Sequence, residues 1–302
     1  MPQFFKKTNI NFVGARWICI SVSAAIIVAG LLTLAIRGQL WSIDFTGGLE
    51  IQVMFDQPVS DSQVRSALTG FNVGEVKAIS GLGQKPEILI RVKADSDQET
   101  VQNQVQQKLT NAFAGNEATI RNVQIVGPKV GRELRGQAIM SAIVMIILLL
   151  IYISWRFEFV YAVGGVLSLL HDTLVTLAIL AFFGYEFSLT VLAAILTLLG
   201  FSINDTIVVY DRIRENLKKL RSMRMGEIIN LSINETLSRT IITSLTVFLT
   251  VLVLFIFGGP VLKGFAFTML VGVITGTYSS IYIAAPIVLE WTERQVIKGK
   301  KR

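Results

Sequence analysis

Six apolar stretches constrain this chain more than any other feature of its sequence. Each is about 20 residues long, which is the length that an α-helix needs to cross the hydrocarbon core of a bilayer. Charged residues make up only 16% of the chain, against about 25% in an average soluble domain. We therefore predict an α-helical polytopic membrane protein with six transmembrane helices. The stretches span residues 17–36, 134–153, 159–182, 187–210, 239–257 and 265–289.

The positive charges predict how these helices are oriented. The net charge is +7, and the basic residues cluster at residues 6–16, 212–224 and 298–302, next to the ends of apolar stretches. Cytoplasmic loops of membrane proteins carry such an excess of lysine and arginine. We expect both termini to be cytoplasmic, in the inner membrane of a bacterium, and we expect no nucleic acid as a partner.

This orientation divides the chain into four parts. The first apolar stretch is long for a signal-peptide core and has no Ala-x-Ala-like site after it, so it is read as an uncleaved anchor. The expected parts are the N-terminus with the first helix (1–36), an exported domain (37–132), a five-helix bundle (133–290) and a basic cytoplasmic tail (291–302). Within the bundle, the basic segment 211–237 is expected to be a cytoplasmic loop.

The exported part shows the pattern of a small α+β domain. Apolar residues alternate with other residues over 49–55, which is the period of a half-buried strand. Ser60 and Gln63 have the spacing of a helix-capping box. Further strands are expected at 73–79, 87–92 and 119–126, with a second helix that begins near residue 95. The order β-α-β-β-α-β predicts a ferredoxin-like fold between the first and second membrane helices.

The third membrane helix carries an aspartate on a face of small residues. Gly164, Ser168 and Asp172 recur every four residues, a spacing that lets helices approach closely in lipid. Asp172 lies about 18 Å from the cytoplasmic end of this helix, so we expect it to face the bundle interior, where it is a further candidate for the mid-membrane step of a proton relay. The adjacent His171 is the only histidine. It is either a hydrogen-bonded core residue or a proton carrier, and a single histidine does not make a metal site.

A second aspartate, Asp205, lies in the fourth apolar stretch. It is roughly 9 Å inside the cytoplasmic boundary, and Ser202, Asn204 and Thr206 make the helix polar around it. An intramembrane carboxylate costs about 2.5–3.5 kcal/mol even on lenient insertion scales. Its presence therefore requires an explanation.

Two explanations are open for Asp205, and both involve the fifth stretch. Arg239 begins that stretch at a comparable depth, with Thr243 one turn further along. In the first reading, Asp205 and Arg239 form a static ion pair that fixes the register of the helices. In the second, Asp205 alternately approaches and leaves Arg239 and so releases and binds a proton, because burial raises the pKa of a carboxyl and a nearby cation lowers it. Intramembrane ionisable groups often mark ion paths, so the second reading is favoured.

Enzyme and cofactor signatures are not evident in the sequence. We find no P-loop, no G-x-S-x-G and no H-E-x-x-H motif. We expect a protein that is not an enzyme and needs no cofactor or metal, with protons as its coupling ion.

Six motifs of this chain resemble those of the SecF family, the smaller membrane subunits of the bacterial SecD–SecF protein-export complex, within the resistance-nodulation-division superfamily. Their joint order and spacing make the resemblance specific, and it runs from about residue 12 to 290. The motifs are WSIDFTGG (41–48), VGPKVG (126–131), LLHDT (169–173), GFSINDTIVVYDRIREN (200–216), LSRTIITSLT (237–246) and FGGPVLKGF (257–265).

The resemblance implies partners and a use of the proton-motive force. It implies SecD, the SecYEG channel and unfolded exported polypeptide as partners, with a membrane insertase as a further one. The force would drive or complete export after the ATP-dependent step. Asp205 and Arg239 match the residues proposed to relay protons in this family, and His171 with Asp172 matches its HD pair. Two alternatives stay open: a scaffold that does not transport, and a half-transporter of the same superfamily for lipids or small hydrophobic compounds.

The segments that join the exported domain to the membrane helices are expected to be hinges. They contain glycines, which absorb large changes of backbone angle. The expected hinge residues are Gly47, Gly48, Gly127 and Gly131.

Overall fold

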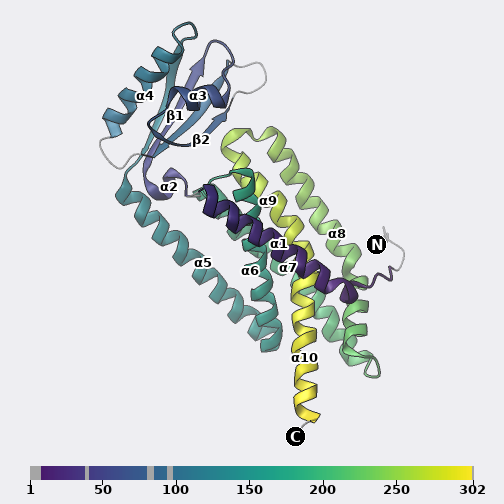
Figure 1. The fold of residues 1–302 in the computed structure, drawn as a ribbon. Coiled ribbons are helices and arrows are strands. Elements are labelled where there is room, and N and C mark those ends of the chain that lie inside the picture. The colour runs from purple at the N-terminus through teal and green to yellow at the C-terminus, as the bar shows by residue number, and fades with distance from the viewer. Residues whose placement is uncertain (1–7, 38–40, 80–84, 94–97, 301–302) are drawn as a thin grey trace.

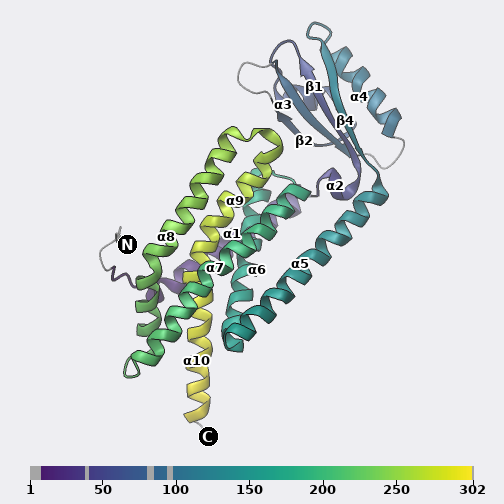
Figure 2. The same ribbon diagram turned by 180° about the vertical axis from the view of Figure 1, so that it is seen from behind.

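The protein consists of a helical bundle and a small α+β domain at one end of it (Figures 1 and 2). The structure is a computed structural model that describes residues 8–37, 41–79, 85–93 and 98–300. Both views place the domain beyond the ends of the long helices, whereas the C-terminus lies at the opposite end of the bundle.

Six long apolar helical segments form the bundle, which confirms the prediction. The last of them is interrupted by a short π-helix, η1, within an otherwise continuous rod. Candidate membrane spans extend beyond the apolar stretches because polar turns continue the helices at their ends. The segments are α1 (Phe12–Arg37), α5 (Pro128–Arg156), α6 (Phe159–Phe183), α7 (Leu189–Lys219), α8 (Met225–Phe257), and α9 (Gly259–Ser279) with η1 (Ser280–Ala284) and α10 (Ala285–Lys300).

The basic segment 211–237 is helical for most of its length, and this corrects the expectation of a loop. Helix α7 continues to Lys219 and α8 already begins at Met225. Ion pairs at helical spacing, such as Lys219 with Glu215, support these polar turns. Arg212 also joins the two helices through Glu235. Charge density alone does not separate a loop from a solvated helix end.

The α+β domain has the predicted ferredoxin-like fold. Its sheet has the strand order β2-β3-β1-β4 with antiparallel neighbours throughout. The Ser60 capping box with Gln63 is present at the start of α3. The expected beginning of the second helix, near residue 95, lies outside the described residues. The elements are β1 (Gly48–Phe55), α3 (Asp61–Ala67), β2 (Asn72–Ala78), β3 (Glu87–Lys93), α4 (Gln98–Ala112) and β4 (Ala118–Val126).

Alternation along β1 gives the domain its own core. Leu49, Ile51, Val53 and Phe55 are fully buried and pack in one cluster with apolar residues of the other strands and of α3 and α4. The other face of β1 is polar and lies away from this core. Because the domain has a separate core, it needs the bundle for its position rather than for its fold.

The loop between α6 and α7 holds the domain against the bundle. The ring of Phe187 stacks on Phe45 and meets Trp41 edge-on, with centroids 5.6 and 5.2 Å apart. Phe45 belongs to α2 (Ile43–Thr46), a single helical turn between α1 and β1. Asp44 of the same turn accepts a hydrogen bond from the backbone N–H of Leu189, at the start of α7. The domain is therefore docked on the bundle through contacts other than its two covalent connections.

The two connections pack against each other. Gly47 has a φ of 84°, which favours glycine. A Cβ on Gly131 would lie 2.9 Å from the backbone nitrogen of Gly47, whereas one on Gly127 would meet nothing within 4 Å. Gly47, Gly48 and Gly131 thus meet conformational or packing requirements of the docked state. Their role as hinges, with that of Gly127, stays a prediction.

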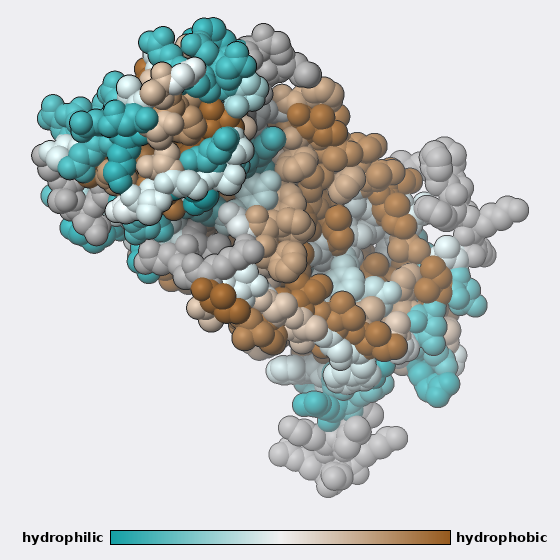
Figure 3. Space-filling model, turned by 45° about the horizontal axis from the view of Figure 1, so that its top comes forward, coloured by the Kyte–Doolittle hydropathy of each residue, from teal (hydrophilic) through white to brown (hydrophobic). Residues whose placement is uncertain are grey.

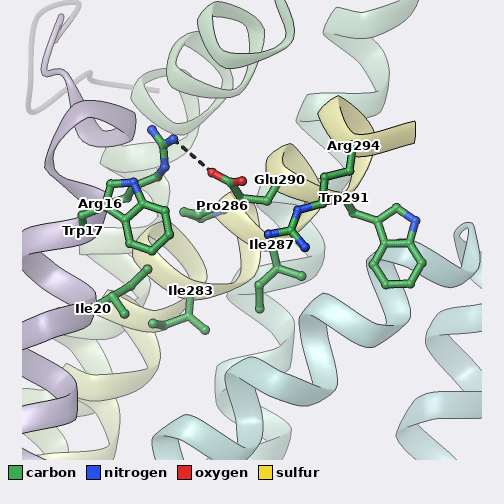
Figure 4. A pocket seen from close by; sticks show the side chains of 9 residues that line it. All are labelled: Arg16, Trp17, Ile20, Ile283, Pro286, Ile287, Glu290, Trp291 and Arg294. Atoms are coloured by element: carbon green, nitrogen blue, oxygen red, sulfur yellow. Dashed lines mark hydrogen bonds and ion pairs between the residues drawn. The ribbon is translucent and has the colours of Figure 1, made fainter. Parts of the chain in front are cut away.

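The outer surface of the bundle is suited to lipid. Figure 3 shows hydrophobic residues over the bundle and mostly hydrophilic ones on the domain. An apolar groove of about 380 Å³ between α1 and α10 carries Trp17, Trp291, Arg16 and Arg294 near its rim (Figure 4). Tryptophan and basic residues concentrate at membrane–water interfaces. The residues of this groove, at the end of the bundle opposite the domain, therefore have the composition of a membrane–water interface.

Small residues let α9 approach α7 closely. A Cβ on Gly272 would lie 2.4 Å from a methyl carbon of Leu198, and one on Gly276 would lie 3.0 Å from Cβ of Ser202. Gly164 of α6 is equally confined, because a Cβ there would lie 2.6 Å from the hydroxyl of Tyr210. These glycines therefore allow α6, α7 and α9 to pack closely against one another.

We predict that Gly272→Val destabilises the bundle. Its side chain would overlap Leu198, and such overpacking typically costs about 1–3 kcal/mol. Thermal unfolding of the purified chain in mild detergent measures the loss. Gly200→Ala is the control, since a Cβ at Gly200 meets nothing within 4 Å and alanine favours a helix by roughly 0.5–1 kcal/mol. Equal loss in both variants would contradict the packing argument.

Candidate functional site

Asp172 is the centre of a hydrogen-bonded cluster inside the bundle. Its side chain is completely buried. Oδ2 accepts hydrogen bonds from the hydroxyls of Ser202 on α7, at 2.6 Å, and Ser279 on α9, at 2.8 Å. Oδ1 lies 3.2 Å from Nδ1 of His171. Ser168 donates in turn to Ser279. Three helices thus converge on one carboxyl group, which faces the bundle interior as predicted.

Ser279 is the last residue of α9, at the point where the last membrane segment changes its helix type. The α-helix changes to a π-helix at the next residue, Ser280, and π-turns inside α-helices are frequent at functional sites. The hydroxyl of Tyr210 donates to the carbonyl of Ala284 at the end of that turn. An irregular backbone and a buried carboxyl therefore lie at the same level of the bundle.

Asp205 is buried as well, but it is held less firmly. It is 2% exposed. Its oxygens accept from Thr243, at 3.5 Å, and Ser244, at 3.2 Å, both on α8. The Thr243 hydroxyl also reaches two backbone carbonyls of α8, so its single proton is contested. Hydroxyls both donate and accept, and this arrangement suits a protonated carboxyl as well as an ionised one.

A short polar chain leads from Asp205 to α9. The Ser244 hydroxyl, which bonds Asp205, lies 2.7 Å from that of Thr277. Thr277 is two residues from Ser279 of the Asp172 cluster. The hydroxyls of Thr176 on α6 and Thr240 on α8 are buried without a hydrogen-bond partner among the described residues. Polar groups that are free to exchange partners therefore lie on several helices of the bundle.

Arg239 lies near Asp205 without pairing with it. Its charge acts on Asp205, yet the guanidinium forms no ion pair with any carboxylate that the structure describes. The residue is on the exposed side of α8, where Leu245 and Leu249 are each 50% exposed. An arginine that faces lipid is costly. The exposed guanidinium of Arg239 therefore makes contact of this part of α8 with lipid unfavourable, and contact with another protein would remove that cost.

The remaining predicted residues fall in different places. His171 stacks on Tyr278, with centroids 6.0 Å apart, and its Nε2 is buried without a partner in the described chain. Thr206 bonds the carbonyl of Ser202 and so supports the helix rather than Asp205. Asn204 is on the exposed side of α7. Its position separates it from both carboxyl groups.

Sequence reasoning missed the α9 partners of both aspartates. Ser279 and Thr277 lie in the last apolar stretch, whose pattern gave no sign that a hydroxyl would point at a carboxyl. Which side chains of α9 meet carboxyl groups depends on how α6, α7, α8 and α9 pack, and the spacing along one helix does not give this. The clustering of serine and threonine between residues 275 and 280 was the one available signal.

These features define a class of protein. The described residues form six candidate membrane spans and a ferredoxin-like domain between the first two, and they place two buried aspartates in the bundle. The chain is a multi-pass membrane protein with ionisable groups at its centre, which is the arrangement found in proton-coupled machines.

Comparisons with known proteins identify the family. The model of the SecD/SecF C-terminal region of protein export membrane proteins matches residues 104–294, and the SecD/SecF GG motif matches residues 41–59. The protein translocase subunit SecF of Calditerrivibrio nitroreducens is 42% identical over 95% of this chain and 97% of its own length. That of Pseudomonas aeruginosa is 39% identical over 95% and 92%. The chain belongs to the SecF family of protein translocase subunits.

Solved structures agree with this assignment. The crystal structure of SecDF from Thermus thermophilus, described as a translocon-associated membrane protein, superposes with a TM-score of 0.82 at 35% identity and covers 97% of this chain. A SecDF structure in a super-membrane-facing form gives a TM-score of 0.72 at 34% identity over 99%. The chain spans only 40% and 41% of those two SecDF chains.

We predict that Ser279→Ala destabilises the bundle more than Ser280→Ala. The first change removes one of two hydroxyl donors from the buried Asp172 carboxyl, and an unsatisfied buried group costs about 1–3 kcal/mol. The Ser280 hydroxyl bonds only the backbone carbonyl of Thr277, so its loss should cost no more than about 1 kcal/mol. Thermal unfolding of both variants in detergent measures the loss of stability. Equal losses would show that the hydrogen bond from Ser279 to Asp172 adds no more stability than the bond from Ser280 to a backbone carbonyl.

Proposed function

We propose that this chain is an accessory subunit of the bacterial Sec translocase that uses the proton-motive force to drive or complete polypeptide export after the ATP-dependent step. The observation that carries this proposal is Asp205, a buried intramembrane carboxyl bonded by two hydroxyls and free of an ion pair within the described residues. The coupling ion is the proton. The chain performs no covalent chemistry and requires no cofactor.

The two aspartates have different roles in this proposal. Asp172 has two short hydroxyl bonds, which fix its position. Asp205 has longer bonds and the charge of Arg239 nearby, so a small displacement of α8 changes the balance between its ionised and protonated forms. Asp205 is the proton carrier, Arg239 regulates it and Asp172 holds the helices together. A charge that crosses 100 mV gains about 2.3 kcal/mol, enough to shift a conformational equilibrium.

The exposed Arg239 supports a membrane partner. A SecD subunit whose helices cover the open face of α8 would remove this guanidinium from lipid. The SecDF structures have more than twice the length that this chain matches, which is the size expected if a second subunit completes the assembly. The SecYEG channel, unfolded polypeptide at the exported domain and a membrane insertase are the further partners that we propose.

The alternatives have less support. A scaffold has no need for a buried carboxyl as loosely bonded as that of Asp205. A half-transporter for lipids or small hydrophobic compounds would need a larger capture domain than the one between α1 and α5. Loss of gradient-dependent export on mutation of Asp205 separates both alternatives from the proposal.

We expect Asp205→Asn to abolish gradient-dependent export while the complex with SecD assembles in normal yield. Asparagine keeps the size and still hydrogen-bonds both hydroxyls, accepting from one through its amide oxygen and donating to the other through its amide nitrogen, but it does not titrate. The double variant with Arg239→Gln should stay inactive. Export into inverted vesicles, with and without an uncoupler, measures the effect. If the pair were structural instead, the single variant would lose about 3–5 kcal/mol of stability and the double variant would regain export.

The orientation has its own test. A single cysteine at Lys218, in a Cys19→Ser background, should react with an impermeant maleimide only from the cytoplasmic side, because it lies in the basic end of α7. A cysteine at Gln106 on α4 is the matched position for the opposite side. Labelling of Lys218→Cys in intact cells would contradict the proposed topology.

A further inference from the structure

A buried carboxyl group at the junction of the domain and the bundle has no part in the relay described above. Glu186 lies in the loop between α6 and α7, outside the membrane-spanning helices, and its side chain is only 12% exposed. Its Oε2 is buried without a hydrogen-bond partner among the described residues. Nη1 of Arg91 on β3 lies 3.9 Å from this oxygen, and that guanidinium is already engaged elsewhere.

Arg91 forms closer ion pairs with two other carboxylates. Its Nε donates to Glu50 of β1 at 2.8 Å, and its Nη1 donates to Glu75 of β2 at 3.0 Å. All three side chains are less than 20% exposed. Glu186 therefore enters a site whose arginine is already neutralised, and it brings a third carboxyl group to one guanidinium.

The charges around Glu186 do not balance when it is ionised. The sheet and α2 contribute the carboxylates of Asp44, Glu50 and Glu75 and the cations Lys77, Arg91 and Lys93. From the loop itself comes Tyr185, whose ring lies 4.7 Å from Nζ of Lys77. Helix α9 lines the same cavity with the uncharged Val261 and Gly264. Three negative and three positive groups thus cancel, and an ionised Glu186 adds one unmatched negative charge.

The domain is shaped to receive this side chain. A Cβ on Gly74 of β2 would lie 2.4 Å from Oε1 of Glu186, so the carboxyl packs directly on the bare backbone of β2 and a larger residue there would displace it. The backbone N–H of Glu75 bonds the same carboxyl. Contacts to Gly74 and Glu75 exist only while the domain is docked, and in both views β2 lies nearer the bundle than α4 does (Figures 1 and 2). Glu186 is thus a group that the docking of the domain itself buries.

We propose that Glu186 is a proton-binding site that controls the docking of the α+β domain on the bundle: the protonated carboxyl holds the domain and the ionised carboxylate releases it. The inference rests on the proposed function in one respect, because that function places this junction on the side from which protons enter. The acidity of that side then regulates the domain directly, separately from the relay at Asp205.

Electrostatics give the sign of the effect. Burial, followed by the charge of Glu75, raises the pKa of Glu186 from 4.5 to about 7 in the docked state, although Arg91 and Lys93 oppose the rise. In an undocked state the carboxyl is solvated and its pKa returns toward the ordinary value. Docking then binds a proton at intermediate pH. It is strongest below pH 4.5, weakens as the pH rises toward 7, and is constant above that.

The test measures domain docking in the full chain, purified with SecD in lipid nanodiscs. Nitroxides at Gln106→Cys on α4 and Leu262→Cys on α9, in the Cys19→Ser background, report the distance between domain and bundle by pulsed electron resonance. We expect the ratio of docked to undocked populations to fall by roughly thirtyfold between about pH 5.5 and 8. Glu186→Gln should remain docked over this range. The control Glu117→Gln, on the exposed surface of the domain, should keep the wild-type response.

A second measurement guards against an indirect effect of the substitution. The infrared band of protonated carboxyl groups should contain one component that titrates with the same midpoint as docking and disappears in Glu186→Gln. A pH-independent distance in the wild type, or an unchanged pH response in Glu186→Gln, would overturn the inference. Neither result would contradict the proposed proton relay at Asp205. Docking is measured without a membrane potential, and the export assay with Asp205→Asn tests the relay alone.

Discussion

The close packing of α7 against α9 is the constraint on which the rest of the bundle depends. Gly272 and Gly276 leave no room for a Cβ against Leu198 and Ser202, so the two backbones approach until side-chain hydroxyls of both helices reach one carboxyl group. Asp172 on α6 then joins the pair through Ser202 and Ser279. Because lipid offers no hydrogen bonds, this cluster is satisfied only when all three helices are in register. Packing and polar satisfaction therefore specify the same arrangement.

The same bundle treats its two aspartates differently. Asp172 of α6 has polar partners on α6, α7 and α9. The hydrogen-bond partners of Asp205 are both on α8, a helix that leaves most of its surface exposed. A helix packed on one face moves at lower cost than one packed on all sides. The carboxyl proposed to carry protons thus depends on the less constrained helix, and its neighbour Arg239 lies where the proposed SecD subunit would contact the chain.

The domain adds a third ionisable centre at the end of the bundle. Its own core makes it independent of the membrane helices for folding, while the aromatic contacts of Phe187 and the Glu186 carboxyl hold it in place. The contacts are of different kinds. Ring packing is insensitive to pH, and a buried carboxyl without a matched cation is sensitive to it. The ring packing therefore fixes where the domain docks, and the protonation of Glu186 changes how strongly it docks.

The sequence by itself determined the six membrane helices, the ferredoxin-like domain and the presence of two intramembrane aspartates. These follow from local patterns: apolar length, alternation along a strand, and residue types that lipid does not tolerate. It also suggested that Arg239 lies close to Asp205, because equal depth follows from counting residues along helices. It did not predict that 211–237 continues α7 and α8, since charge patterns alone do not separate loops from solvated helix ends.

Only the tertiary structure decided which groups meet. Ser279 reaches Asp172 because two glycines let α9 approach α7 closely, Arg239 faces outward because of the rotation of α8, and Glu186 is buried because the domain docks on the loop that carries it. Each of these depends on contacts between residues far apart in the chain. Helix rotation and domain docking are set by packing across many residues at once, and no short stretch of sequence encodes them.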